Sequence, residues 1–295
     1  MLATVTVGIS YYNPGRFLRP AIQSVFAQSL QDWQLVLVND GSTDGSDEWV
    51  RKISDSRVRV MGDSRRMGLP SRLNQIATMA DTPFLARMDA DDIMHPMRLE
   101  RQLAFLQENQ DVDVVGSYAF SIDVDNRPTG LWGDRPMPHS PFEVFARGCF
   151  VHPSVLARTA WFRSNPYSEL YPRAEDTELW ARTVVNSTFS RIPEPLLFVR
   201  DVGVFQLRKY LAGSAQIRTM VGSGRVAGIS RAQRFKVIAC SCAKGLVYVV
   251  ANGLGIEEWL VRRRDVSLKP QELETAAATL ETVLATVIPE REKRP

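Results

Sequence analysis

Acidic side chains follow two apolar stretches of the sequence, each at the point where a β-strand should end. They are Asp40, Asp44, Asp89, Asp91 and Asp92. The carboxyl ends of neighbouring parallel strands meet at one rim of an α/β sheet, where such proteins bind their ligands. Clustered carboxylates repel one another, so a positive group or a hydrogen-bond donor must offset their charge. Mg²⁺ or Mn²⁺ takes oxygen ligands and commonly bridges to a phosphate, so we expect a metal ion that holds a diphosphate at this rim.

Each acidic group also has a simpler interpretation. The stretch "DGSTDGS" at residues 40–46 has the composition of a turn that leads into a helix. The stretch "DADD" at residues 89–92 has the composition of an ordinary solvated loop. The two groups stand at equivalent ends of alternating strands, and this shared position favours a functional site.

Four further residues are candidates for the same site. Arg72 lies near the start of a predicted helix and brings positive charge toward a phosphate, although a surface arginine is the simpler interpretation. His152 stands in "HPS" before an apolar stretch, where a loop histidine is equally expected. Glu175 and Asp176 occupy the first turn of a predicted helix, a place that favours acidic residues without any further function.

The elements that must position these residues alternate between strand and helix. Apolar stretches predict early strands at 4–10, 33–38, 57–61 and 83–88. Helical spacing predicts helices between them at 16–28, 46–53 and 69–79. Further along we expect, in order, a helix at 96–108, a strand at 112–120, a loop or hairpin at 122–141, a helix at 142–147, a strand at 151–157, a helix at 175–185 and a last strand in "PLLFVRD". This alternation predicts an α/β fold with a mainly parallel sheet flanked by helices.

Composition and charge narrow the class of protein. The chain of 295 residues is 44% hydrophobic and 23% charged, as in an ordinary globular protein. Its net charge of +3 gives no reason to expect nucleic acid binding. Three cysteines do not make a disulfide framework, and they suit a reducing, cytoplasmic compartment. The first residues have the pattern of a strand rather than of a signal peptide.

The C-terminal part, from about residue 206, is predicted to be helical and basic. Between Arg208 and Arg264, eleven basic residues minus two acidic ones leave a local excess of nine positive charges, interleaved with apolar residues. This pattern is typical of docking on an anionic membrane surface, and the alternative is packing of these helices on the rest of the chain. The apolar stretch 237–255 has Lys244 near its middle, so we expect it not to span a membrane.

Six motifs in this order resemble those of the family 2 glycosyltransferases, inverting enzymes of the GT-A fold. The matching stretches are "VTVGISYYN", "NDGSTD", "GLPSRLN", "DADD", "HPS" and "EDTELW". The resemblance covers roughly residues 3–200 and implies a GT-A catalytic domain at 1–205, followed by an α-helical extension at 206–295. Within the domain, a nucleotide-sugar half would end at about 118, and an acceptor half would fill 119–205.

The resemblance implies that Asp40 holds the nucleotide base and that Tyr11 lines the base pocket, with Ser10 nearby. Arg72 is a further nucleotide-binding candidate because its charge would lie close to the phosphates. The chain departs from the family at Arg66, where an asparagine is frequent, and this leaves the donor preference open. The His-Ser pattern that often follows the last strand is also missing after "FVRD".

The resemblance also implies the residues of catalysis. Asp89 and Asp91 fall at the DXD positions, where Asp89 would contact ribose or metal and Asp91 would contact a Mn²⁺ or Mg²⁺ ion on the diphosphate. Asp176 falls at the position of the catalytic base, with Glu175 beside it. His152 would lie near the diphosphate or the acceptor.

The function expected from these residues is transfer of a sugar from a nucleoside diphosphate sugar to a hydroxyl of a saccharide or a lipid-linked saccharide, in the synthesis of a cell-surface polysaccharide or glycolipid. We expect a cytoplasmic protein, with docking on the inner face of the cell membrane if the basic segment binds lipid. One alternative is a sugar-nucleotide pyrophosphorylase, but "VGISYYNPGRF" lacks the glycine-rich basic signature of that class. The other is a non-catalytic carbohydrate- or partner-binding module, which should have lost the acidic motifs that are intact here.

Overall fold

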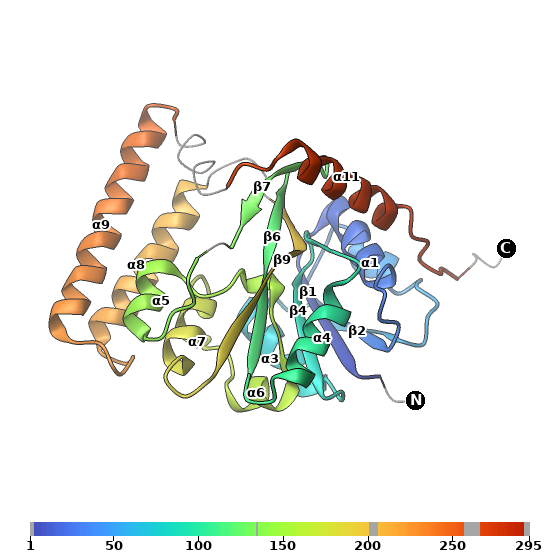
Figure 1. Ribbon diagram of the computed structural model, residues 1–295, viewed down its shortest axis with the longest axis horizontal. Helices are drawn as coiled ribbons and strands as arrows, with labels where there is room; N and C mark the ends of the chain where they lie inside the picture. The colour runs from blue at the N-terminus through green and yellow to red at the C-terminus, as the bar shows by residue number, and fades with distance from the viewer. Residues whose placement is uncertain (1–2, 134, 201–205, 257–265, 292–295) are drawn as a thin grey trace.

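A computed structural model describes residues 3–133, 135–200, 206–256 and 266–291. It shows one mixed sheet of nine strands, with helices packed on both faces (Figure 1). The strands are β1 (Val5–Tyr11), β2 (Trp33–Asp40), β3 (Val58–Asp63), β4 (Phe84–Asp89), β5 (Ile93–Met94), β6 (Val114–Ile122), β7 (Pro128–Trp132), β8 (Leu156–Arg158) and β9 (Phe189–Arg200). The predicted α/β class is confirmed.

The order of the strands is β3-β2-β1-β4-β8-β6-β9-β5, and β7 pairs with the outer part of β6. The predicted parallel pairing holds for β3, β2, β1 and β4, and again for β6 with β9. By contrast, β8, β7 and β5 run antiparallel to their neighbours. The ends of β2 and β4 therefore lie on the same rim, on either side of β1.

The helices begin and end close to the predicted positions. They are α1 (Leu18–Phe26), α2 (Ser46–Val50), α3 (Leu69–Met79), α4 (Arg98–Glu108), α5 (Pro141–Arg147), α6 (Thr159–Ser164), α7 (Glu175–Thr183), α8 (Leu207–Ser223), α9 (Arg231–Gly253) and α11 (Pro270–Leu284), with short 3₁₀ turns η1 (Gly15–Phe17) and η2 (His152–Ser154). The expected helical character of the C-terminal part is confirmed for its described residues.

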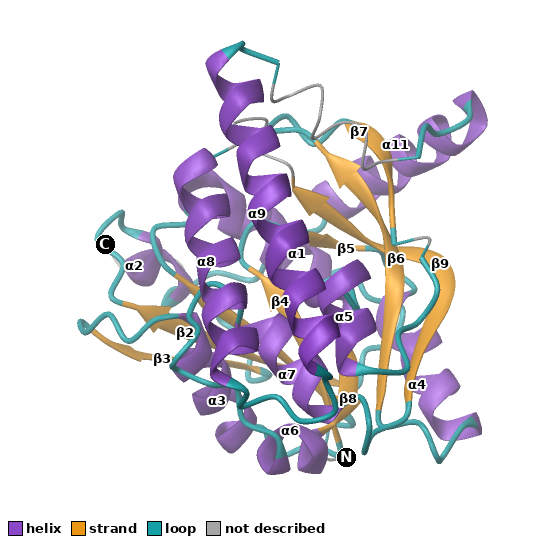
Figure 2. Cartoon of the chain, turned by 90° about the vertical axis from the view of Figure 1, so that its left-hand side faces the viewer, coloured by secondary structure: helices purple, strands orange, loops and turns teal. Residues whose placement is uncertain are grey.

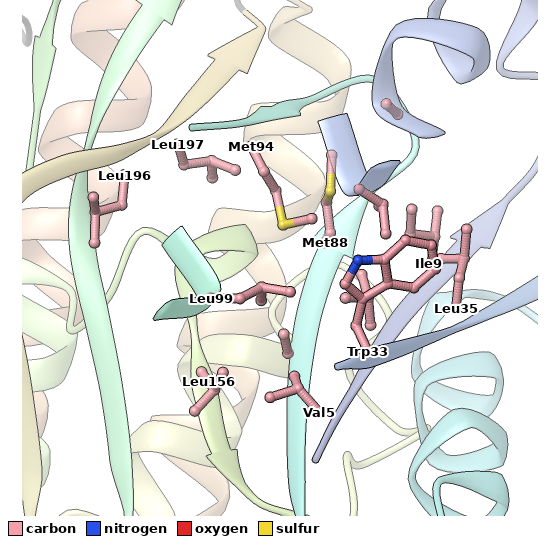
Figure 3. Close-up of a cluster of buried hydrophobic side chains, with 14 of the residues drawn as sticks. Val5, Ile9, Trp33, Leu35, Met88, Met94, Leu99, Leu156, Leu196 and Leu197 are labelled. Atoms are coloured by element: carbon pink, nitrogen blue, oxygen red, sulfur yellow. The ribbon is translucent and has the colours of Figure 1, made fainter. Parts of the chain in front are cut away.

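Alternate side chains of the strands serve two cores. In β2, Leu35 and Leu37 face one core, together with Trp33, while Val36 and Val38 face the other. Figure 3 shows the first core, where side chains from β1, β2, β4 and α4 meet. On the opposite face, α3 packs directly on β1 because Gly8 has no side chain, and a Cβ there would lie 2.3 Å from Ile76 Cγ2.

Two predictions of local structure were wrong, and two short elements were not predicted. The stretch expected as a strand at 151–157 forms η2 and then the short strand β8, because Pro153 has no N–H for a ladder and Ser154 Oγ accepts a bond from the Ser117 N–H of β6. The last strand begins at Phe189 rather than at Pro195. Helix α6 and strand β5 were not expected at all, since each is too short to give a period.

The C-terminal helices pack in two different places. Helix α11 lies over α1 and β7, and its Ala276, Leu280 and Val283 share a core with Phe120 and Phe198 of the sheet. Helices α8 and α9 lie side by side at the other end of the molecule, against α5 (Figures 1 and 2). Residues 257–265, which include part of the predicted basic segment, lie outside the described residues, as does Asp201 of "FVRD".

Candidate active site

Asp40 ends β2 and is fully bonded inside the protein. Its Oδ1 accepts a bond from the Met67 N–H at 2.7 Å and from Arg72 Nε at 2.9 Å, and the Gly68 N–H lies 3.1 Å from both carboxylate oxygens. The residue is only 5% exposed. The carboxylate thus fixes the loop before α3 against the end of β2, and its own charge is already offset.

Arg72 is turned inward rather than toward solvent. Besides Asp40, its guanidinium donates to Asp63 Oδ1 at 2.9 Å, to the Arg65 carbonyl at 2.6 Å and to Gln75 Oε1 at 2.9 Å. All three of its nitrogen atoms are therefore engaged, and a direct contact with a phosphate would break these bonds. In this structure Arg72 positions Asp40 and the loop, and the predicted phosphate contact stays a prediction.

Tyr11 is the last residue of β1 and Tyr12 follows the strand, and the two side chains differ in exposure. The role of Tyr11 in the base pocket stays a prediction. Tyr11 is buried, and its hydroxyl donates to Asp47 Oδ1 at 2.8 Å; burial, and then Asp47, raise the pKa of Tyr11. Tyr12 is 41% exposed, and the Arg66 guanidinium carbon lies 3.9 Å from the centre of its ring. The stacked pair of Tyr12 and Arg66, which the sequence reasoning missed, is the exposed aromatic surface next to the Asp40 loop.

The alternation of side chains along β1 explains why Tyr11 is buried and Tyr12 is exposed. Side chains of a strand point to opposite faces in turn, so Tyr11 continues the buried series of Val5, Val7 and Ile9 in β1. The first residue after the strand leaves that series. Counting the period from the strand's apolar residues would have assigned Tyr12, not Tyr11, to the rim.

The end of β4 carries a partly buried ion pair. Asp89 lies opposite Ser10 of β1 in the parallel register, so both predicted residues reach the rim together. Arg87, two residues earlier, is buried, and its guanidinium donates to both Asp89 oxygens at 2.6 and 2.9 Å. The sequence reasoning missed Arg87, although a charged residue within an otherwise apolar strand was a signal that it has a partner there.

The next two aspartates are less well compensated. Asp92 is buried, its Oδ1 accepts a bond from the Arg200 N–H at 2.9 Å, and its Oδ2 has no hydrogen-bond partner among the described residues. Burial, and then the charge of Asp89, raise the pKa of Asp91 to about 6 and that of Asp92 well above its usual range. This corner of the site therefore has more negative charge than the protein around it neutralises.

The donor set at this corner fits a divalent cation of limited protein ligation. No group of three or more His, Cys, Asp and Glu side chains placed to hold a metal ion occurs in the described part of the chain. Mg²⁺ and Mn²⁺ at phosphate sites need only one or two carboxylates, because phosphate and water supply the remaining oxygens. Asp91 forms no ion pair within the described ranges, and Asp89 lies close enough to raise its pKa. The two carboxylates of the DXD stretch therefore suit such an ion.

The first turn of α7 carries the acids of the second predicted group. Glu175 is 8% exposed, and its Oε2 lacks a hydrogen-bond partner in the described part of the chain. Burial, and then the charge of Asp176, raise the pKa of Glu175 to about 7. Asp176 Oδ1 accepts a bond from the Thr177 N–H at 2.6 Å, and burial raises the pKa of Asp176.

His152 completes this side of the site. Its Nε2 lies 2.9 Å from the Tyr167 hydroxyl, and burial, together with the charge of Arg87, keeps its pKa well below the usual value for histidine. The imidazole is therefore neutral at physiological pH. His152 and Asp176 line one cavity of about 260 Å³, with Trp180, Arg147 and Arg191 in its wall.

Arg87 links the two groups of acids. It pairs with Asp89 on the strand side, and its charge also acts on the pKa of Glu175, Asp176 and His152. Asp91, which follows β4, and Asp176, in the first turn of α7, are 85 residues apart in the sequence. The fold brings the two groups of acids together around the buried guanidinium of Arg87. This arrangement suits a reaction in which one substrate has an anionic group and a carboxylate removes a proton.

Comparison with other sequences places the chain in a family. The sequence profile of "Glycosyl transferase family 2" matches residues 6–174. The chain is 32% identical over 187 residues to the EpsE protein of Bacillus subtilis, across 60% of the chain and 66% of EpsE. It is 26% identical over 191 residues to WfgD of Escherichia coli, named as a UDP-Glc:alpha-D-GlcNAc-diphosphoundecaprenol beta-1,3-glucosyltransferase, across 64% of the chain and 72% of WfgD. The matches thus cover about two thirds of each relative.

Solved structures show the same fold. TarS of S. aureus, residues 1–349 in complex with UDP, superposes with a TM-score of 0.58 at 17% identity, covering 95% of this chain and 80% of that one. The mannosyltransferase PcManGT of Pyrobaculum calidifontis, in complex with GDP-Man and Mn²⁺, gives 0.57 at 13% identity and covers 96% of this chain and 86% of that one. These likenesses confirm the predicted GT-A architecture. With the profile matching more than half of its length, the chain belongs to glycosyl transferase family 2.

Proposed function

We propose that this glycosyltransferase moves a sugar from a nucleoside diphosphate sugar to an acceptor hydroxyl, with inversion at the anomeric carbon. The observation that carries this function is the meeting of two acidic groups around Arg87 at the carboxyl ends of the strands. One group is under-compensated and suits a cation and a diphosphate. The other begins α7 and offers a carboxylate of raised pKa.

The donor would lie along the rim between β2 and β4. The Tyr12–Arg66 pair offers a stacking surface for the nucleotide base next to the loop that Asp40 holds. Asp91 and Asp89 would hold the divalent cation, which when bound offsets the charge of the diphosphate and stabilises its departure. The neighbours with solved complexes bind UDP or GDP-Man, which supports a nucleotide sugar as the donor class.

Asp176 would act as the general base. Its carboxylate takes the proton of the acceptor hydroxyl while the oxygen forms a bond to the anomeric carbon, and the bond from that carbon to the diphosphate breaks on the opposite face. Asp176 lines the cavity that His152 also lines, whereas Glu175 is not part of that cavity wall. A raised pKa brings the base closer to the working pH, where proton transfer is most efficient.

His152 would orient the acceptor or the departing diphosphate. The neutral ring is held by the Tyr167 hydroxyl, so it can exchange a hydrogen bond with a substrate group without adding charge. The three arginines of the cavity wall, at 135, 147 and 191, give this side of the site a positive character.

Substitution of the base tests this mechanism. Asp176→Asn keeps the shape of the side chain but cannot accept a proton, so transfer should fall by roughly 10²–10⁴-fold while donor binding persists. Glu175→Gln is the matched control, and it should retain most of the transfer rate. Equal loss in the two variants, or an unchanged rate in Asp176→Asn, would contradict the assignment of the base.

A lipid-linked acceptor on the cytoplasmic face of a membrane would suit helix α9. This is the one helix, among the residues that the structure describes, whose length and composition would allow it to cross a membrane. Its outward side is apolar, with Phe235 74% and Leu246 65% exposed. From 207 to 253 the sequence has no Asp or Glu and eight basic residues: Arg208, Lys209, Arg218, Arg225, Arg231, Arg234, Lys236 and Lys244.

We infer that α9 rests in the surface of an anionic bilayer, with its apolar side inserted and its cations at the headgroups. The name of WfgD, which includes a diphosphoundecaprenol-linked substrate, supports such an acceptor class. Co-sedimentation with anionic vesicles, weakened by salt and by Leu246→Gln, is the expected result. Equal pelleting with neutral vesicles would contradict it.

A further inference from the structure

A second cavity lies between α5, α8 and α9, and it shares no lining residue with the cavity that contains Asp176. Its volume is about 430 Å³. Aromatic and aliphatic side chains, including Phe142, Phe145, Tyr210 and Val237, make up part of its wall. The rest of the wall has a different chemistry, and the two parts together define what the cavity can bind.

Four cations line the same cavity: Arg173, Lys209, Lys236 and Lys244. No Asp or Glu is part of the wall, and none of the four forms an ion pair with the described residues. Lys236 Nζ lies 5.7 Å from the centre of the Phe142 ring, which is a cation–π contact and leaves the charge uncompensated. An apolar cavity with several unpaired cations is complementary to an anionic group on an apolar chain.

A hydroxyl pair adds hydrogen-bonding capacity. Ser214 of α8 and Ser241 of α9 both line the cavity, and their hydroxyl oxygens are 2.6 Å apart. Arg218 Nη1 donates to both, at 3.0 and 3.2 Å, from behind the wall. One hydroxyl donates to the other, so the pair is held in place at the junction of the two helices, and one O–H is left to donate to a phosphate oxygen.

The wall of this cavity is shared with the catalytic side. Helix α5 contributes Phe142 and Phe145 to it and contributes Val144 and Arg147 to the cavity that contains Asp176. Arg173, in the wall, is three residues before Asp176, and α8 approaches it closely, since a Cβ on Gly213 would lie 3.2 Å from the Arg173 carbonyl oxygen. The two cavities therefore share α5 as a wall.

We propose that this cavity binds an anionic amphiphile, a phosphate or diphosphate joined to a long apolar chain. The four cations and the hydroxyl pair take the phosphate, and the chain follows the apolar wall toward the exposed side of α9. In terms of the transfer reaction proposed above, on which this second step rests, the cavity seats the lipid phosphate of the acceptor while its saccharide reaches Asp176.

Two cysteines of α9 provide the test. Cys240 and Cys242 are both exposed, but only Cys240 lines the cavity, and Cys149 is buried. Dodecyl phosphate, below the concentration at which it forms micelles, should slow maleimide modification of Cys240 in the full chain and leave Cys242 unaffected, as measured by peptide mass spectrometry. Inorganic phosphate and dodecyl maltoside should each protect Cys240 much less, because each offers only one of the two chemistries.

Matched double variants separate the cavity from general attraction. Lys236→Gln with Lys244→Gln should weaken the protection by dodecyl phosphate about tenfold or more. Arg225→Gln with Arg231→Gln removes the same charge from the same hairpin outside the wall, and it should leave the protection unchanged.

Three results would overturn the assignment: equal slowing of both cysteines, equal loss in both double variants, or protection by dodecyl maltoside or inorganic phosphate as strong as that by dodecyl phosphate. The measurement needs neither donor nor transfer. Its failure would therefore speak against the cavity alone, and failure of the Asp176 experiment would speak against the proposed reaction alone.

Discussion

The two strand ends that looked alike in the sequence differ in how their negative charge is balanced. At the end of β2, Asp40 meets Arg72 and two backbone N–H groups, so nothing remains to be neutralised. Beyond β4, burial and then the nearby charge of Asp89 raise the pKa values of Asp91 and Asp92. The charge at the first end is balanced within the protein, whereas the acids at the second end can still bind a cation. The amino-acid composition of the two strand ends does not distinguish them, whereas the hydrogen bonds and ion pairs of their carboxylates do.

The largest effect on stability should come from breaking the ion pair between Asp40 and Arg72. Asp40→Asn removes one partner of a buried ion pair and leaves Arg72 under-compensated, which should lower the free energy of unfolding by roughly 3–5 kcal/mol. Chemical denaturation measures this. Asp63→Asn, which removes the other and more exposed partner of Arg72, is the control and should cost little. If both variants were equally stable, the contrast between the strand ends would be lost.

Removal of the charge of Glu175, which is buried in the first turn of α7, should instead stabilise the protein. Because the pKa of Glu175 is raised from 4.5 to about 7, the folded chain binds its proton more tightly than the unfolded chain does. The free energy of unfolding should therefore fall as pH rises from about 4.5 to about 7, by an amount of order 3 kcal/mol.

Glu175→Gln should remove this fall, so that the variant is more stable than the natural chain at pH 8 and similar to it at pH 4. Glu178→Gln on the same helix is the control. Glu178 is also buried, but it pairs with Arg182 at 2.8 Å, so its substitution should not stabilise the protein at any pH. A pH profile of unfolding that Glu175→Gln leaves unchanged would argue against an uncompensated carboxyl.

The smallest effect concerns the two tyrosines beside Asp40. Tyr12→Ala removes the exposed stacking surface and should weaken nucleotide binding by roughly 1–2 kcal/mol, with little change in stability. Tyr11→Phe removes a buried hydrogen bond to Asp47 and should show the reverse pattern, with about 1 kcal/mol lost in stability and nucleotide binding retained. Calorimetric titration with UDP and GDP distinguishes them. Loss of binding in Tyr11→Phe alone would restore the original assignment.

The sequence was sufficient for the features that depend on local pattern. The alternation of strands and helices, the rim where β2 and β4 end, and the placement of Asp89 and Asp91 all follow from periodicity and motif order. The inward turn of Arg72 did not follow, since its partners come from Asp40 and Asp63 on two other elements. These contacts between distant segments are set by packing, which no single stretch of sequence encodes.

Arg87 illustrates the same limit in the active site. Its neighbours in β4 are apolar, and its charge acts on residues of α7 and η2 that are far away in the chain. Its role became visible only when the strand, the helix and the 3₁₀ turn were assembled. The short elements β5 and α6 escaped prediction for a related reason, because each contains too few residues to show a period.

Calorimetric titration of UDP and GDP, with Mn²⁺ and with excess EDTA, tests the central difference between the strand ends most directly. We expect that at least one of the nucleotides binds with Mn²⁺ and loses most of its affinity in EDTA. We also expect that Asp91→Asn abolishes the Mn²⁺ dependence without lowering the melting temperature. Binding of equal strength in EDTA, or Mn²⁺-dependent binding that survives in Asp91→Asn, would contradict the assignment of a cation to the acids that follow β4.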